Sequence, residues 1–160
     1  MVTVPVVAAL HGMLEERTRT WAEANGVFIN FLDADAEAYW RLLAAEWQHP
    51  GDLLLVEHDI VPAAGVSEAM SACRRPWCTS PYRIAHSWLD EGLGCVKFSA
   101  RLKQRHPDLM DRLGEITGDG LPAKDWHRLD TRLAWLLRSH GYRPHTHRRS
   151  DHLHDYGVRP

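Results

Sequence analysis

The feature that most constrains the fold is a run of four apolar residues, Leu53 to Val56, just after the turn signal His49-Pro50-Gly51. A strand with one face in water alternates apolar and polar side chains, whereas an uninterrupted apolar run indicates a strand buried on both faces. Such strands are typical of parallel sheets covered by helices on each side. The run ends directly in the charged sequence Glu57-His58-Asp59.

Strand-like and helix-like segments alternate along the rest of the chain. Apolar stretches predict strands at 4–9, 27–32, 77–82, 94–98 and 142–147, and amphipathic or capped stretches predict helices at 12–24, 33–48, 66–73, after Ser99 and at 125–140. The polar, glycine-rich segment 114–123 is expected to be a mobile loop. The alternation predicts an α/β fold with a mostly parallel sheet and helices on both faces. A length of 160 residues suits a single domain over 1–160, with a histidine-rich tail at about 145–160.

The composition argues against several classes of protein. A formal net charge of −2 gives no electrostatic reason to bind bulk nucleic acid or an anionic membrane. No apolar run reaches the roughly 18 residues that a membrane-spanning helix needs, and Met1 to Leu10 lacks the basic start of a signal peptide. The three cysteines, Cys73, Cys78 and Cys95, form no Cys-x-x-Cys pair, which favours reduced thiols in a cytoplasmic protein.

The first candidate site is the acidic turn at the end of the predicted central strand. Ligands of parallel α/β sheets bind beyond the carboxyl ends of the strands, where Glu57 and Asp59 follow Val56. Positions 57 and 59 face the same side of an extended chain, so their carboxylates can hold magnesium or manganese. A polar turn where a strand reaches the surface accounts for these residues about equally well.

Further candidates lie later in the chain. Asp130 falls at the edge of the apolar stripe of its helix, where a carboxylate can act as a general base or stabilise the helix dipole. His152 and His154 alternate on an extended segment and can share a metal, although most histidines in such a tail are solvated. A separate zinc site in the tail is not favoured, because no pair of cysteines accompanies the histidines. Gly92 and Gly94 allow the backbone to approach a ligand closely.

Four features occur together in a characteristic order. They are the strand and acid-x-acid turn "LLLVEHDIVP", the glycine turn and strand "GLGCVKFS", the acid-bearing helix "DWHRLDTRLAWLLRSHGYRPH" and the histidine tail "DHLHDYG". In this order they resemble glycosyltransferases of the GT-A fold, especially short forms from actinobacteria and their phages, over roughly residues 27–157. The resemblance implies a Rossmann-like fold and an enzyme that transfers a sugar from a nucleotide-diphosphate sugar to a hydroxyl acceptor.

The resemblance also implies roles for particular residues. Asp59 would bind Mn²⁺ or Mg²⁺ that holds the donor diphosphate, with His152 or His154 as the late histidine ligand. Glu57 would contact the ribose or a metal-bound water, and the turn from Gly92 to Gly94 would line the sugar pocket. Asp130 would be the base on the acceptor hydroxyl. The chain differs from the family pattern in starting the acid-x-acid motif with Glu57 and in having Arg128-Leu129 before Asp130.

Two other functions fit the same residues. A metal-dependent phosphohydrolase or nucleotidyltransferase also uses acids at a strand end, but it usually has a second acid pair for a second metal. A catalytically inactive module that binds nucleotide sugars would need only the pocket, with Trp77, Trp88 and Trp126 close to it for stacking. By contrast, Trp40, Trp47 and Trp135 are expected to anchor the core.

Overall fold

The predicted central strand, β3 (Asp52–Glu57), lies inside a six-stranded sheet in the computed structural model, which describes residues 3–153. The order across the sheet is β2-β1-β3-β8-β5-β9. The other five strands are β1 (Thr3–Ala9), β2 (Phe28–Phe31), β5 (Trp77–Thr79), β8 (Cys95–Phe98) and β9 (His145–Thr146). β8 runs antiparallel to both of its neighbours, and the other pairs are parallel, so five of the six strands share one direction. This mostly parallel sheet confirms the predicted α/β fold.

β3 is buried on both faces, as its apolar run predicts. Leu53 and Leu55 belong to one hydrophobic core, and Leu54 and Val56 belong to a second core on the opposite face of the sheet. This division follows from strand geometry, because successive side chains point to opposite faces. The run of apolar residues therefore supplies both cores at once.

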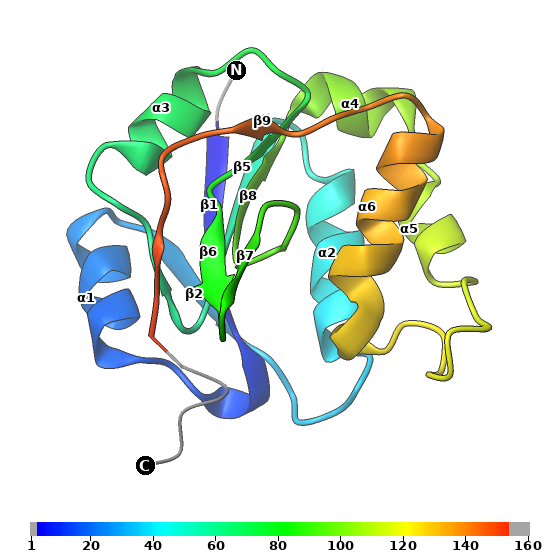
Figure 1. Ribbon diagram of the computed structural model, residues 1–160, viewed down its shortest axis with the longest axis horizontal. Coiled ribbons are helices and arrows are strands. Elements are labelled where there is room, and N and C mark those ends of the chain that lie inside the picture. The colour runs from blue at the N-terminus through cyan, green and yellow to red at the C-terminus, as the bar shows by residue number, and fades with distance from the viewer. Residues whose placement is uncertain (1–2, 154–160) are drawn as a thin grey trace.

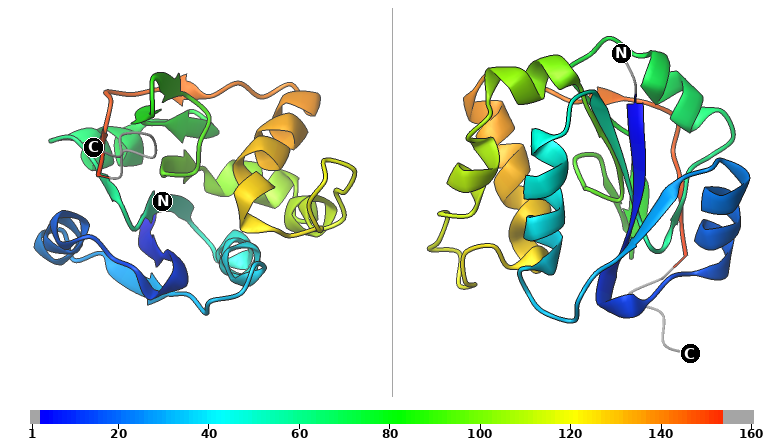
Figure 2. Two further views of the ribbon diagram at one scale, coloured as in Figure 1. Left: turned by 60° about the horizontal axis from the view of Figure 1, so that its bottom comes forward. Right: turned by 180° about the vertical axis from the view of Figure 1, so that it is seen from behind.

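Helices cover both faces of the sheet (Figures 1 and 2). The helices are α1 (Glu16–Ala24), α2 (Ala38–Gln48), α3 (Val66–Ala72), α4 (Ala100–Arg105), α5 (Leu109–Leu113) and α6 (Leu129–Ser139), with short 3-10 turns η1 (Leu10–Gly12) and η2 (Trp126–Arg128). α1 and α3 lie on one side, and α2, α5 and α6 lie on the other (Figure 1). Within residues 3–153 no helix is both long and apolar enough to cross a membrane.

The cap expected for α4 is borne out, whereas Asp125, at the start of the helix predicted over 125–140, caps the 3-10 turn η2 that precedes α6. The Ser99 hydroxyl accepts a hydrogen bond from the backbone N–H of Leu102, and Asp125 accepts one from the N–H of His127 at the start of η2. Side-chain caps of this kind satisfy N–H groups that have no partner inside a helix. Gly141 follows α6 with a φ of +83°, a left-handed conformation that glycine adopts without steric cost.

Two predicted placements of tryptophan are wrong. Trp135 was expected in the core, but it is 62% exposed, because burial of Leu133, Leu136 and Leu137 turns position 135 of α6 toward solvent. Trp77 was expected beside the site, but it is 1% exposed and packs in the core. Whether a tryptophan is buried depends on which face of its helix or strand carries it, and the residue type alone does not reveal that face.

The segment 114–123 is a loop, and it is fastened to α6. The buried guanidinium of Arg132 binds the Asp119 carboxylate through two hydrogen bonds of 2.8 and 2.6 Å. This ion pair lowers the pKa of Asp119 to about 2. Bidentate arginine–carboxylate pairs are among the stronger charged contacts in proteins, so this loop has a fixed attachment point.

The last described segment runs across the molecule from β9 (Figure 1). It ends in β10 (Asp151–His152), which pairs antiparallel with β4 (Ile60–Val61) just beyond the acidic turn. A hairpin of β6 (Tyr82–Ile84) and β7 (Ser87–Leu89) lies nearby. These short strands bring the C-terminal segment to the end of β3.

Candidate functional site

A cavity of about 420 Å³ lies at the edge of the sheet where β1 and β3 end. The residues that line it come from widely separated parts of the chain, and they are Leu10, Met13, Tyr39, Glu57, His58, Asp59, Tyr82, Ile84, Leu93, Trp126, His127, Asp130 and His152. This is the edge at which α/β sheets bind ligands. Four residues singled out in the sequence, Glu57, Asp59, Asp130 and His152, therefore face one space.

Asp59 and His152 are in direct contact at this edge. Pairing of β10 with β4 places His152 opposite Ile60, and the N–H of Leu153 donates to the carbonyl of Asp59 at 2.8 Å. This register brings Nε2 of His152 to 3.1 Å from Oδ2 of Asp59. Both side chains are only 5–6% exposed. Backbone pairing between distant segments thus builds a buried carboxylate–imidazole pair.

The spacing of this pair suits two ligands of one metal ion. Adjacent ligands of an octahedral ion bound at about 2.1 Å lie about 3 Å apart. His58 adds a second imidazole, with Nε2 at 3.9 Å from the same oxygen of Asp59. His154, the other predicted histidine ligand, lies outside the described residues.

Glu57 is a carboxyl group with an unusual environment. Tyr39 donates a hydrogen bond to its Oε1 at 2.9 Å, and its backbone N–H donates to the carbonyl of Gly94. Burial, and then the charge of Asp59, raise the pKa of Glu57 from 4.5 to about 8, although the bond from Tyr39 acts in the opposite direction. Glu57 is therefore mostly protonated at neutral pH in the metal-free protein.

The raised pKa of Glu57 predicts a pH-dependent stability. A group whose pKa is higher in the folded than in the unfolded protein stabilises the fold fully at pH values below its unfolded pKa, here 4.5. That stabilisation is lost as the pH rises through the folded pKa of about 8. Between pH 5 and 9, wild type should therefore lose on the order of 4 kcal/mol of unfolding free energy relative to Glu57→Gln. Urea denaturation in a chelating buffer measures this difference.

A suitable control for that experiment is Glu23→Gln. Glu23 is exposed on α1, so this substitution should shift the stability curve equally at every pH. Parallel curves for wild type and Glu57→Gln would contradict the raised pKa.

Asp130 lies in the first turn of α6, at the margin of the apolar stripe. Its Oδ1 accepts a hydrogen bond of 2.7 Å from the N–H of Thr131. Burial raises the pKa of Asp130, against the hydrogen bonds from Thr131, and its charge also raises the pKa of Glu57 across the cavity. Asp130 therefore faces the cavity from the helix side, whereas Asp59 and His152 approach it from the sheet edge.

Gly92 and Gly94 have a different relation to the cavity from the one expected. A Cβ on Gly92 would lie 2.3 Å from the hydroxyl of Tyr82, and one on Gly94 would lie 2.4 Å from its ring. Neither glycine is among the residues that line the cavity, whereas Tyr82 is. The two glycines make room for the Tyr82 ring, which is the surface that a ligand would meet.

Sequence reasoning missed several residues of the cavity wall. Tyr39 and Tyr82 offer phenol groups beside Glu57, and Leu93 adds an apolar surface. Trp126, which was expected near the site, lines the wall and stacks on His127 with ring centroids 3.7 Å apart. No local pattern marks Tyr39, because the stripe of α2 explains its burial without a ligand.

Comparison with known proteins shows a similarity in fold only. No protein-family profile and no curated protein matches the sequence. Among solved structures, "Crystal Structure of A197 from STIV" is similar, with a TM-score of 0.53 at 12% sequence identity, over 94% of this chain and 83% of that chain. At this identity, the likeness supports the α/β architecture and carries no information about activity.

Proposed function

We propose that this protein is a metal-dependent glycosyltransferase that moves a sugar from a nucleotide-diphosphate donor to a hydroxyl acceptor. The observation that carries the proposal is the convergence of Glu57, Asp59, Asp130 and His152 on one cavity at the carboxyl edge of the sheet. The resemblance of the sequence to GT-A glycosyltransferases gives these four residues complementary roles. We place the reaction in the cytoplasm, where free thiols such as Cys78 and Cys95 stay reduced.

In this proposal Asp59 and His152 hold a divalent cation, Mn²⁺ or Mg²⁺. When bound, such an ion would offset the negative charge that develops on the departing diphosphate. Glu57 would add a third ligand, a carboxylate oxygen bound directly or through water, once its proton is released. Burial, and then the charge of Asp59, raise the pKa of Glu57, and a cation bound between the two carboxylates would offset both effects.

Asp130 would accept the proton of the acceptor hydroxyl. Its position on α6, across the cavity from Asp59 and His152, leaves space for a sugar between donor and acceptor sides. Tyr82 and Trp126 provide flat aromatic walls, which suit the apolar faces of sugars and nucleobases. A cavity of about 420 Å³ is in the usual range for small-molecule sites.

Thermal-shift measurements with nucleoside diphosphates, with and without Mn²⁺, test this proposal. A ligand that binds only the folded protein raises the melting temperature, so at least one diphosphate should stabilise wild type, and only with the metal present. His152→Gln should reduce that shift, whereas the exposed His86→Gln should not. No shift with any diphosphate would refute nucleotide-sugar binding, and release of free sugar without an acceptor would favour a hydrolase instead.

A further inference from the structure

A second group of metal-binding side chains lies away from the cavity described above. Cys73, which ends α3, meets His145 and His147 of the β9 segment, with one ligand atom of each residue within 4.8 Å of the others. The sequence gives no sign of this group, because the cysteine and the histidines lie far apart along the chain and no Cys-x-x-Cys pair is present. Parallel pairing of β9 with β5 brings them together, with His145 opposite Cys78.

The backbone holds each of the three residues in place. The N–H of Cys73 donates to the carbonyl of Met70, and Nζ of Lys97 donates to the carbonyl of Cys73. The N–H of His147 donates to the carbonyl of Thr79 at 2.8 Å, which continues the β9 ladder beyond Thr146. His145 and His147 are alternate residues of an extended segment, so both rings lie on the same side. Their ring centroids are 4.9 Å apart.

The environment of one nitrogen atom of His147 indicates that this group binds a ligand. Nε2 of His147 is buried and has no hydrogen-bond partner among the residues that the structure describes. A buried polar atom without a partner costs free energy, and native proteins rarely leave one in that state. A bound cation would satisfy this nitrogen directly, because neutral imidazole offers a lone pair to a metal.

We propose that Cys73, His145 and His147 bind Zn²⁺ and thereby fasten the C-terminal segment to the edge of the sheet. Zinc accepts one thiolate and two imidazoles in tetrahedral geometry, with a fourth position for water. Its bond lengths place neighbouring ligand atoms about 3.4–3.6 Å apart. The three ligand atoms already lie within 4.8 Å of one another, so small side-chain rotations bring them to bonding positions. The ligand set has no carboxylate, which separates it from the oxygen-rich site that Mn²⁺ prefers.

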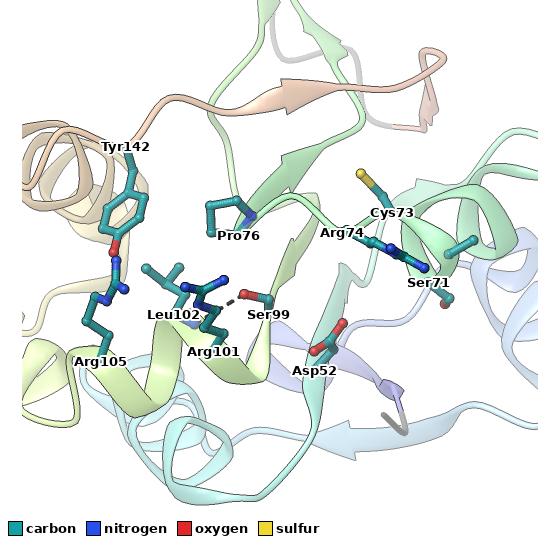
Figure 3. A pocket seen from close by; sticks show the side chains of 11 residues that line it. Asp52, Ser71, Cys73, Arg74, Pro76, Ser99, Arg101, Leu102, Arg105 and Tyr142 are labelled. Atoms are coloured by element: carbon teal, nitrogen blue, oxygen red, sulfur yellow. Dashed lines mark hydrogen bonds between the residues drawn. The ribbon is translucent and has the colours of Figure 1, made fainter.

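Two cationic side chains belong to the surroundings of the site. The ammonium of Lys97 donates a hydrogen bond to the backbone carbonyl of Cys73, and Arg74 is next to Cys73 in the chain. The same cations oppose a dication, but Asp52 lies 3.4 Å from Lys97 and offsets part of its charge. Cys73 also lines a cavity of about 600 Å³ with Asp52 and Arg74, so solvent and ions reach its side of the site (Figure 3).

The consequence for the fold concerns the chain after β9. That segment passes from the proposed zinc site to β10, where His152 contacts Asp59 (Figures 1 and 2). The zinc site would anchor its beginning, and the β4–β10 pairing anchors its end. The inference does not depend on glycosyl transfer, since it concerns different ligands and a different metal.

Binding of Co²⁺ to the full chain, in a non-thiol reductant, tests the proposal. Cobalt replaces zinc in such sites, and its bond to a thiolate gives a near-ultraviolet charge-transfer band. Wild type should show this band, Zn²⁺ should abolish it, and Cys73→Ser should lack it. Loss of a residue that hydrogen-bonds to a metal ligand costs about 10–100-fold in metal affinity. His147→Gln removes a ligand itself, so it should weaken binding at least as much.

The exposed His86→Gln serves as the matched control and should bind Co²⁺ as wild type does. Zn²⁺ should also raise the melting temperature of wild type but not of Cys73→Ser. Circular dichroism of the metal-free variants checks folding, and His147→Gln provides the test if Cys73→Ser does not fold. Absence of the thiolate band in wild type overturns the proposal. Binding that persists unchanged in Cys73→Ser also overturns it, because the tail histidines alone would then bind the metal.

Discussion

Replacing Asp59 with asparagine should abolish Mn²⁺-dependent binding of a nucleoside diphosphate while leaving the protein folded. The amide of the new side chain keeps an oxygen that can accept the hydrogen bond from His152, so the buried contact at 3.1 Å is largely preserved. The substitution removes the negative charge, and hard cations such as Mn²⁺ and Mg²⁺ depend on charged oxygen ligands. We expect affinity for the metal–diphosphate complex to fall by at least about 100-fold, or about 2.7 kcal/mol.

Isothermal titration with the metal and diphosphate together measures this loss. Asp111→Asn is the matched control, because Asp111 is an exposed carboxylate on α5, away from the cavity, and its loss should leave binding unchanged. Equal affinity in wild type and Asp59→Asn, or undiminished binding in excess chelator, would rule out Asp59 as a metal ligand.

Replacing Asp130 with asparagine should separate binding from turnover. If Asp130 accepts the proton of the acceptor hydroxyl, Asp130→Asn should bind donor and metal as wild type does but turn over about 10²-fold or more slowly. The half-buried position supports this role, because burial raises the pKa of Asp130 and makes it a better proton acceptor than a solvated aspartate. If Asp130 only stabilises the helix dipole, the variant should lose at most about 1 kcal/mol of stability and remain active.

Asp125→Asn provides the control for this experiment. Asp125 caps η2, just before α6, and asparagine is an equally good capping residue, so both stability and turnover should be retained. Turnover is measured as transfer of labelled sugar to the acceptor, and donor affinity is measured in the same preparation. Normal turnover by Asp130→Asn would falsify its role as the base.

Much of the secondary structure was determined by local sequence. The uninterrupted run Leu53–Val56 predicts a strand buried on both faces, and the structure places its alternate residues in two different cores. The stripe of leucines in α6 fixes the rotation of that helix, and with it the position of Asp130 at the margin of the buried face. These features are readable because side-chain period and capping depend only on residues a few positions apart.

The candidate site was only partly readable. Acids at the end of a buried strand and on the first turn of α6 were identified, because both positions follow from the geometry of single elements. The contact of His152 with Asp59 was not predictable as a distance, since it depends on the register between β4 and β10. Strands of two residues carry too little pattern to reveal their partners.

What the tertiary structure alone decided is which distant residues meet. The sequence argued against a tail zinc site because no cysteine pair accompanies the histidines, yet the fold brings Cys73 to His145 and His147. The antiparallel direction of β8 and the exposure of Trp135 likewise follow from how whole elements pack. Local periodicity fixes which face of an element is apolar, but the neighbour of that face is chosen by the topology of the whole chain.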